Sequence, residues 1–138
     1  MRPQYIEQIT QELTWKLRQK ELYPNLPIDA IKLSEDDLGT HLGLFYENKL
    51  VTVVSLFEKD NQLQLRKLAT DSKYQNKGLG TEIMNYVLAY AKEKNLEKVW
   101  CNARSTATKF YLKLGFISTE SYFTRDGVDF VIMEKNIL

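Results

Sequence analysis

The period of the apolar residues changes twice between residues 62 and 103, and no other feature of the sequence constrains the fold as strongly. In QLQLRKLAT (62–70) apolar and polar residues alternate, which is typical of a half-buried strand. From 79 to 94 the apolar residues recur at steps of three and four, which predicts an amphipathic helix. KVWCNA (98–103) again favours a strand. Strand, helix and strand in this order predict a parallel strand pair joined by a right-handed crossover.

Further strands joined by tight turns are predicted on both sides of this segment. They are rich in β-branched and aromatic residues, and Asp126-Gly127 favours a tight reversal near the end of the chain. The fold class that follows is α/β, a mixed and mostly antiparallel sheet with one parallel pair and helices on its faces, in a single domain over residues 1–138. The predicted strands are 41–46, 50–57, 62–70, 98–103, 116–124 and 128–135, with a short helix at about 106–114.

The N-terminal 40 residues carry weaker patterns. Residues 4–9 are ambiguous, with a short first strand as one option. Thr10 is predicted to cap a helix that runs to about Leu22 and ends before Pro24, because proline cannot continue a helix. Residues 28–40 are polar and are predicted to form a loop.

Composition excludes several classes of protein. Lys and Arg total 19 against 18 Asp and Glu, so the net charge of +1 indicates neither a nucleic-acid partner nor an anionic membrane. The single cysteine, Cys101, rules out an internal disulfide and a cysteine metal cluster, and we expect no metal. No apolar run approaches the roughly 18–20 residues of a membrane span, and MRPQYIEQ lacks the apolar stretch of a signal peptide. A cytoplasmic location is the expectation.

Two glycines, Gly78 and Gly80, stand in YQNKGLGTEI (74–83), where the long helix has to begin. Glycine lets a ligand approach the main chain, and the start of a helix offers unpaired N–H groups with a partial positive charge. Together these favour a phosphate site, with the N–H groups of about Gln75 to Thr81 around a pyrophosphate and Lys77 at its rim. A turn that is merely softened by glycine is the alternative.

Two common phosphate-binding motifs do not fit this turn. A P-loop is excluded because no Gly-Lys-Ser/Thr follows the glycines. A dinucleotide fingerprint requires a third glycine where Ile83 stands, and it requires an acid near Val99 or Trp100.

A second motif lies downstream, in the order and at the spacing that make the pair specific. QNKGLG (75–80) together with NARSTATKFYLKLGF (102–116) resembles the GNAT superfamily of N-acetyltransferases, over about residues 41–135. The resemblance implies that acetyl-coenzyme A is the co-substrate. It also implies that this molecule lies where two parallel central strands, here 62–70 and 98–103, splay apart.

The resemblance further implies which residues contact acetyl-coenzyme A. The pantetheine arm would bond the main chain near the end of strand 62–70, and the pyrophosphate would bind the glycine turn. Asn102 would contact the pantetheine or an ordered water, Phe110 would pack on the arm, and Lys109 or Lys113 would approach the adenosine phosphates. The implied cofactor-binding residues are Leu68, Ala69, Thr70, Gln75, Asn76, Lys77, Gly78, Leu79, Gly80, Thr81, Asn102, Phe110 and Lys113.

Tyr111 matches the family tyrosine that donates a proton to the departing sulfur, and a phenol with an ordinary pKa of ~10 is protonated at neutral pH. A main-chain N–H near Leu68 is the expected oxyanion donor. The other interpretation of Tyr111 is a core aromatic, because it lies on the apolar face of its helix.

The base that deprotonates the acceptor amine is the weakest point of the resemblance. Some members use a Glu on the strand that ends near position 70, but Gln64 and Arg66 stand there in this chain, so we expect deprotonation through ordered water. Arg66 is a candidate for binding an acceptor carboxylate, with a salt bridge on the sheet as the alternative. His41 is a lesser candidate for the base, and acyl transfer through Cys101 is not favoured. Arg18 and Asp129 are expected to be solvated surface charges.

Three functions follow for testing. The leading one is an N-acetyltransferase in which an amine of a small molecule or protein attacks acetyl-coenzyme A directly in a ternary complex. The others are a non-catalytic acyl-coenzyme A binding module and an interaction domain with a purely architectural turn. The acceptor cannot be identified from the sequence, and either a monomer or a homodimer is compatible with it.

Overall fold

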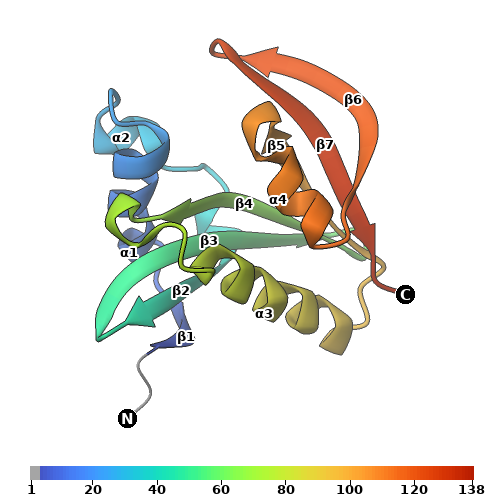
Figure 1. The fold of residues 1–138 in the computed structure, drawn as a ribbon, viewed down its shortest axis with the longest axis horizontal. Helices are drawn as coiled ribbons and strands as arrows, with labels where there is room; N and C mark the ends of the chain where they lie inside the picture. The colour runs from blue at the N-terminus through green and yellow to red at the C-terminus, as the bar shows by residue number, and fades with distance from the viewer. Residues whose placement is uncertain (1–3) are drawn as a thin grey trace. The chain divides into compact units, whose positions relative to one another are not determined.

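A computed structural model describes residues 4–138 of the chain, which divides into two compact units (Figure 1). The first unit comprises the described residues up to Phe57 together with Arg66–Ile83, and the second comprises Glu58–Leu65 and Met84–Leu138. The sheet has seven strands in the order β1-β2-β3-β4-β5-β7-β6. The predicted α/β class with a mixed sheet is confirmed, whereas the single domain stays a prediction.

The first unit is built on an antiparallel meander of β1 (Gln4–Ile9), β2 (Thr40–Tyr46) and β3 (Lys49–Lys59). Glu47 and Asn48 both have positive φ, which is the conformation that a two-residue hairpin turn requires. The remaining elements that lie mainly in this unit are α1 (Glu12–Leu17), the π-helix η1 (Arg18–Leu22), α2 (Ile28–Ile31), η2 (Asp36–Leu38) and η3 (Ser72–Tyr74).

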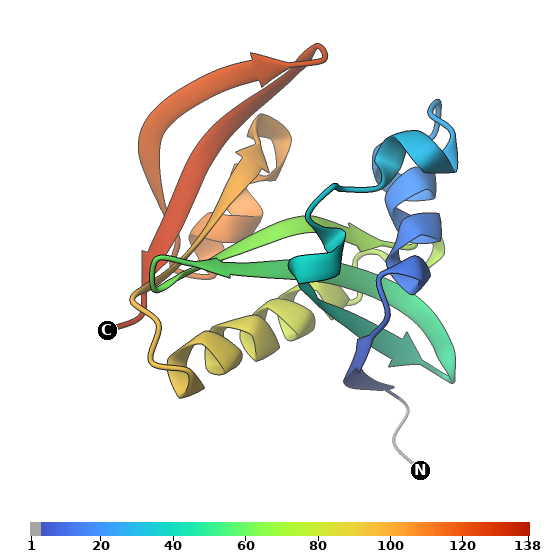
Figure 2. The same ribbon diagram turned by 180° about the vertical axis from the view of Figure 1, so that it is seen from behind.

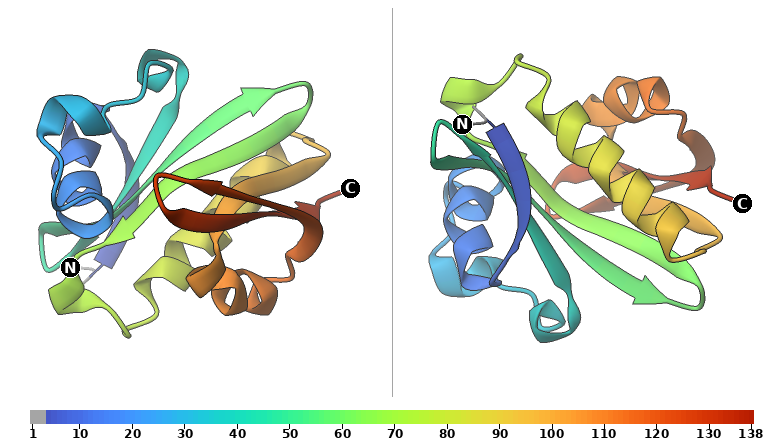
Figure 3. Two further views of the ribbon diagram at one scale, coloured as in Figure 1. Left: turned by 90° about the horizontal axis from the view of Figure 1, so that it is seen from above. Right: turned by 90° about the horizontal axis from the view of Figure 1, so that it is seen from below.

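The core of the first unit lies between α1 and the sheet. Leu17 of α1, Val53 of β3 and Ala69 of β4 (Gln62–Thr70) are buried together, and Ile9, Leu22 and Leu50 pack against them. Figure 3 shows α1 lying across the sheet at this position. Burial of these apolar side chains is therefore what fixes the first helix on β3 and β4.

The second unit is built on β5 (Lys98–Arg104) and on a hairpin of β6 (Ile117–Arg125) and β7 (Val128–Asn136), which is seen from behind in Figure 2. β5 pairs along its whole length with β7, from Lys98↔Asn136 to Arg104↔Phe130. The hairpin reverses at Asp126 and Gly127, which have φ of 53° and 77°, as Asp-Gly predicts. The unit also holds η4 (Ser105–Ala107), α4 (Thr108–Lys113) and most of α3 (Leu79–Glu93).

The predicted parallel pair is present but short. β4 pairs with β5 only from Gln62↔Lys98 to Gln64↔Trp100, although β4 continues to Thr70. The ladder between the two strands therefore ends about a third of the way along β4.

The N-terminal predictions need correction. Residues 4–9 do form a strand, but Gln11 rather than Thr10 is the N-cap of α1, and no side chain caps it. Leu13 is 51% exposed, because the buried face of the helix carries Thr14 in its place. The last turn, 18–22, is a π-helix.

The predicted loop at 28–40 contains two short helices, α2 and η2. Pro27 occupies the N-cap of α2, a position close to the first helical turn, where proline is tolerated because its missing N–H would find no partner. Helices of four and three residues are too short to produce a visible apolar period, which is why the sequence did not indicate them.

Candidate functional site

The turn that leads into α3 exposes main-chain N–H groups in the first unit. The first i→i−4 bond of the helix runs from Glu82 N–H to the Gly78 carbonyl at 3.0 Å, so the N–H groups of Leu79, Gly80 and Thr81 precede it. Gly78 has φ of 76°, and a Cβ built on it would meet no atom within 4 Å. Glycine is thus favoured by the conformation, and the space over it is open to a ligand.

Side-chain hydrogen bonds hold the residues that precede Gly78. The Asp71 carboxylate accepts a bond from Lys73 N–H at 3.0 Å and so caps η3, and the Gln75 amide donates to the Thr70 carbonyl at 3.0 Å. Asp71 is buried, and its pKa is held below the usual value, first by the bond from Lys73 N–H. Gln75, Asn76, Lys77 and Gly78 themselves are exposed.

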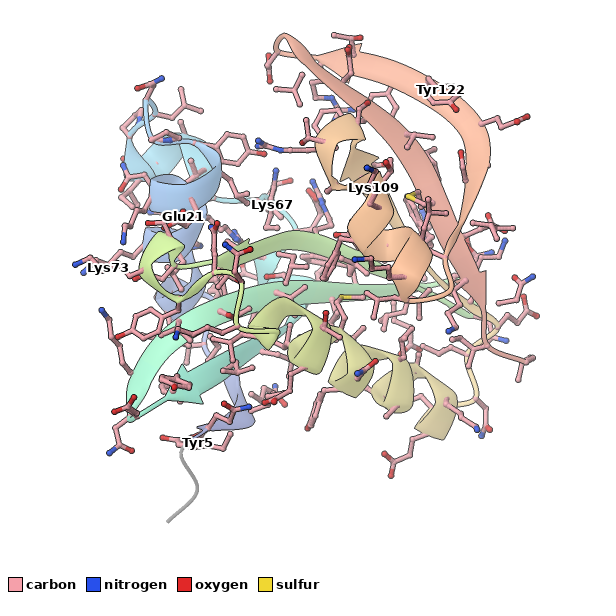
Figure 4. The ribbon with its side chains drawn as sticks, in the orientation of Figure 1. Tyr5, Glu21, Lys67, Lys73, Lys109 and Tyr122 are labelled. Carbon is pink, nitrogen blue, oxygen red and sulfur yellow. The ribbon has the colours of Figure 1, made fainter. Side chains whose placement is uncertain are left out.

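Side chains at the end of the first helix form an ion pair and a hydrogen bond with the turn before α3. Lys20 Nζ lies 3.1 Å from Asp71 Oδ1, and Ser72 N–H donates to Glu21 Oε2 at 2.8 Å. Lys49 Nζ approaches Asp71 Oδ2 at 3.9 Å from the start of β3. Figure 4 shows Glu21 beside η3, with Lys73 projecting outward from it. We call the contacts of Asp71 and Ser72 with Lys20, Glu21 and Lys49 the clasp.

The backbone of β4 is irregular within its second half. Lys67 has φ of 58°, a left-handed conformation that is uncommon for a residue other than glycine and is typical of a bulge or a strained site. Leu68, Ala69 and Thr70, the residues implied to bond the pantetheine arm, follow directly, and of these only Ala69 is buried. No pattern in the sequence indicated the irregularity at Lys67.

Arg66 forms a salt bridge, as one of its two interpretations proposed. Its Nη1 lies 2.7 Å from Glu35 Oε2, and its guanidinium stands over the Phe57 ring at 5.7 Å. The neighbouring Lys67 instead donates to the phenol oxygen of Tyr23 and stands over the Tyr23 ring.

The expectation that Arg18 is a solvated charge was wrong. Arg18 is fully buried, and its guanidinium bonds both oxygens of Asp36 at 2.8 Å. Burial would raise the pKa of Asp36, but the bonds from Arg18 and from Leu33 N–H outweigh it and lower the pKa to about 2. This ion pair holds η2 against the first helix.

His41 completes the same buried network. Arg18 Nη2 donates to Ser55 Oγ at 2.8 Å, and Ser55 Oγ lies 2.7 Å from His41 Nδ1. His41 Nε2 lies 2.9 Å from the Asp36 carbonyl, which can only accept, so Nε2 carries the hydrogen and Ser55 donates to Nδ1. Both ring nitrogens are engaged in the core, which assigns His41 a structural role instead of that of a base.

In the second unit, Tyr111 of α4 is 7% exposed and meets the rings of Phe110 and Phe116 edge-on at 5.1 and 5.5 Å. Burial raises the pKa of its phenol well above the usual value, and the charge and hydrogen bond of the neighbouring Cys101 act in the same direction. Burial likewise raises the pKa of the Cys101 thiol to about 12. The phenol therefore remains a proton donor at any working pH, and the thiol is a poor nucleophile.

The other predicted side chains of the second unit lie on β5, α4 and β7. Asn102 is half-buried and pairs with Ile132, and Phe110 is half-buried. Lys113 is exposed, as is Lys109, which Figure 4 labels on α4. Asp129 is exposed, as expected, and accepts a bond from Thr124 Oγ1.

Between residues 4 and 138, no group of three or more His, Cys, Asp or Glu side chains is placed to hold a metal ion. Within the same range, no helix has the length and apolar character needed to cross a membrane.

Comparison with known proteins gives consistent matches. The model of the acetyltransferase (GNAT) domain matches residues 25–137. YitI of Bacillus subtilis (strain 168), an uncharacterized N-acetyltransferase, is 28% identical over 142 residues, which cover 96% of this chain and 95% of YitI.

Solved structures agree in fold. A candidate N-acetyltransferase from Lactobacillus plantarum has a TM-score of 0.89 at 20% identity, over 99% of this chain and 100% of that one. A GNAT family acetyltransferase from Elizabethkingia anophelis, solved with acetyl-CoA bound, has a TM-score of 0.77 at 18% identity, over 99% of both chains.

Proposed function

The chain belongs to the GNAT acetyltransferase family, whose model covers most of its length, and we propose that it transfers the acetyl group of acetyl-coenzyme A to an amine of a small molecule or a protein. The observation that carries the proposal is the turn before α3. There a left-handed glycine with open space above it precedes three helix-start N–H groups, an arrangement suited to a pyrophosphate.

In the proposed reaction the amine attacks acetyl-coenzyme A directly in a ternary complex. The neutral nitrogen adds to the thioester carbonyl carbon, so a C–N bond forms and an electron pair moves onto the carbonyl oxygen. When that pair returns, the C–S bond breaks and the sulfur leaves with its electrons. The nitrogen loses one proton and the sulfur gains one, which leaves an amide and coenzyme A.

Two groups of this chain would assist these steps. The main-chain N–H near Leu68 would stabilise the oxyanion, a contribution typically worth ~3 kcal/mol. Tyr111 would protonate the departing sulfur, a role for which its raised pKa keeps the phenol in the donor form.

The proton on the acceptor nitrogen would leave through ordered water. Gln64 and Arg66 stand where some family members have a Glu, and Arg66 is held by Glu35. The buried and fully bonded His41 is not free to accept a proton.

The missing carboxylate at Gln64 and Arg66 also favours a second candidate, a module of the same fold that binds acyl-coenzyme A without turnover. Release of the coenzyme A thiol, measured over a panel of amines up to a pH of about 9, separates the two. Transfer requires thiol release that depends on the amine and that falls in Tyr111→Phe. Calorimetric binding of acetyl-coenzyme A with no amine-dependent release would establish the module instead.

A further inference from the structure

Lys67 has a strained backbone conformation beside the proposed oxyanion donor. It is the one residue of β4 with a left-handed conformation, at φ of 58°. Strained backbone of this kind costs about 1–3 kcal/mol and is concentrated at functional sites. Leu68, whose N–H is the proposed oxyanion donor, is the next residue, so the Lys67 side chain begins one residue before that donor.

The charge of Lys67 is not compensated by a carboxylate. Its ammonium donates to the phenol of Tyr23 and lies 4.5 Å from the centroid of that ring. None of the ion pairs found between residues 4 and 138 involves Lys67. The adjacent Arg66, in contrast, is neutralised by Glu35 at 2.7 Å.

Lys67 is also held on the side of β4 that faces the first helix. Tyr23, which holds the Lys67 ammonium, directly follows η1 in sequence. In Figure 4 the Lys67 side chain projects from the β4 ribbon. Lys67 is half-buried as a residue, and its ammonium is held at a defined place against Tyr23, which favours recognition of an anion over simple solvation.

We propose that the acceptor is an amine that also carries a carboxylate, and that Lys67 binds this carboxylate. The inference rests on the proposed transferase function and assigns its substrate class. A carboxylate is a stronger partner for an ammonium than a neutral phenol, so it takes the place of Tyr23 on Lys67 Nζ. Diamines, whose second charge is positive, are repelled from the same position.

The test compares ω-amino acids of two to six carbons with their amides, which have the same length but no negative charge. Thiol release from acetyl-coenzyme A gives kcat/KM for each, corrected for the fraction of neutral amine. In the wild type the best amino acid exceeds its amide by about tenfold or more, the range of a charge-assisted hydrogen bond. Lys67→Gln brings this ratio close to one, and Lys67→Glu makes 1,4-diaminobutane the better acceptor.

Lys59→Gln is the matched control, because it removes the same charge from an exposed position at the end of β3 and leaves the ratio unchanged. Circular dichroism checks that each variant folds, and Lys67→Gln alone decides the matter if the charge reversal does not fold. Turnover of acids and amides at equal rates in the wild type, or an equal fall for both in Lys67→Gln, overturns the acceptor assignment and leaves the transferase in place. Absence of turnover with every amine overturns the proposed function and this inference with it.

Discussion

Gly78 and Gly127 have nearly the same positive φ, 76° and 77°, and a Cβ added to either would meet no atom within 4 Å. A side chain at either position therefore causes the same backbone strain and no clash. Gly78 lies in the turn before α3, whereas Gly127 lies at the tip of the β6–β7 hairpin. Comparing substitutions at the two glycines therefore distinguishes an effect on stability from an effect on ligand binding.

We expect Gly78→Ala and Gly127→Ala each to lower the free energy of unfolding by about 1–2 kcal/mol, because a left-handed conformation disfavours a Cβ. Only Gly78→Ala should weaken the binding of acetyl-coenzyme A, by about tenfold or more, because the new methyl group stands where the pyrophosphate approaches. Urea unfolding and titration calorimetry measure the two effects. Equal affinity in both variants would mean that the turn is purely architectural.

Tyr111→Phe should lower kcat by about 10²-fold to 10⁴-fold while acetyl-coenzyme A affinity changes little, because the lost hydroxyl is needed only when the sulfur leaves. Since the pKa of the Tyr111 phenol is raised, the donor stays protonated and the wild-type rate should not fall up to a pH of about 10. A pH–rate profile measures both. Loss of activity with an apparent pKa between 7 and 9 would contradict the role given to Tyr111.

Residue patterns predicted the strands and the α-helices of residues 40–136 but not the short η3, because a half-buried strand or helix must alternate or repeat its apolar side chains. The turns at Glu47-Asn48 and Asp126-Gly127 were predictable for a local reason. Asn48, Asp126 and Gly127 are of the types that tolerate positive φ and stand between two strand patterns, and the structure shows positive φ at these positions and at Glu47.

The buried network of Arg18, Asp36, Ser55 and His41 could not be predicted from local sequence patterns. Arg18 lies on a helix with polar neighbours, and its partner Asp36 stands 18 residues away in a segment predicted to be a loop. Nothing local distinguishes that arginine from a solvated one. The left-handed Lys67 was hidden for a similar reason, since an irregularity within a strand depends on its neighbours in the sheet.

The Arg18–Asp36 pair should make stability depend on pH at the acid end. The pKa of Asp36 falls from 3.8 to about 2 on folding, so the folded state binds its proton less readily than the unfolded chain does. The pair therefore contributes about 2 kcal/mol to the free energy of unfolding. This contribution is complete above pH 3.8 and is lost as the pH falls through 2. Urea unfolding at pH 5, 3.5 and 2.5 should show this loss for the wild type.

Asp36→Asn gives the matching control for that measurement. It should lower the free energy of unfolding at pH 7 by about 3–5 kcal/mol, because Arg18 is left as an uncompensated buried charge. Its stability should then fall less steeply between pH 5 and 2.5 than that of the wild type. An unchanged slope would show that other carboxylates govern the acid transition.

The clasp around Asp71 should position the turn before α3 for the pyrophosphate. We expect Asp71→Asn to raise KM for acetyl-coenzyme A several-fold with little change in kcat, because the variant weakens the cap on Lys73 N–H and the ion pair with Lys20. S-acetylpantetheine lacks the pyrophosphate, so its kcat/KM should stay the same. Asp29→Asn, which breaks an exposed ion pair with Lys32 in the same unit, is the control. It should leave kcat/KM unchanged with both acetyl donors. An equal loss for the two donors in Asp71→Asn would show that Asp71 supports the fold in general and does not position the phosphate-binding turn.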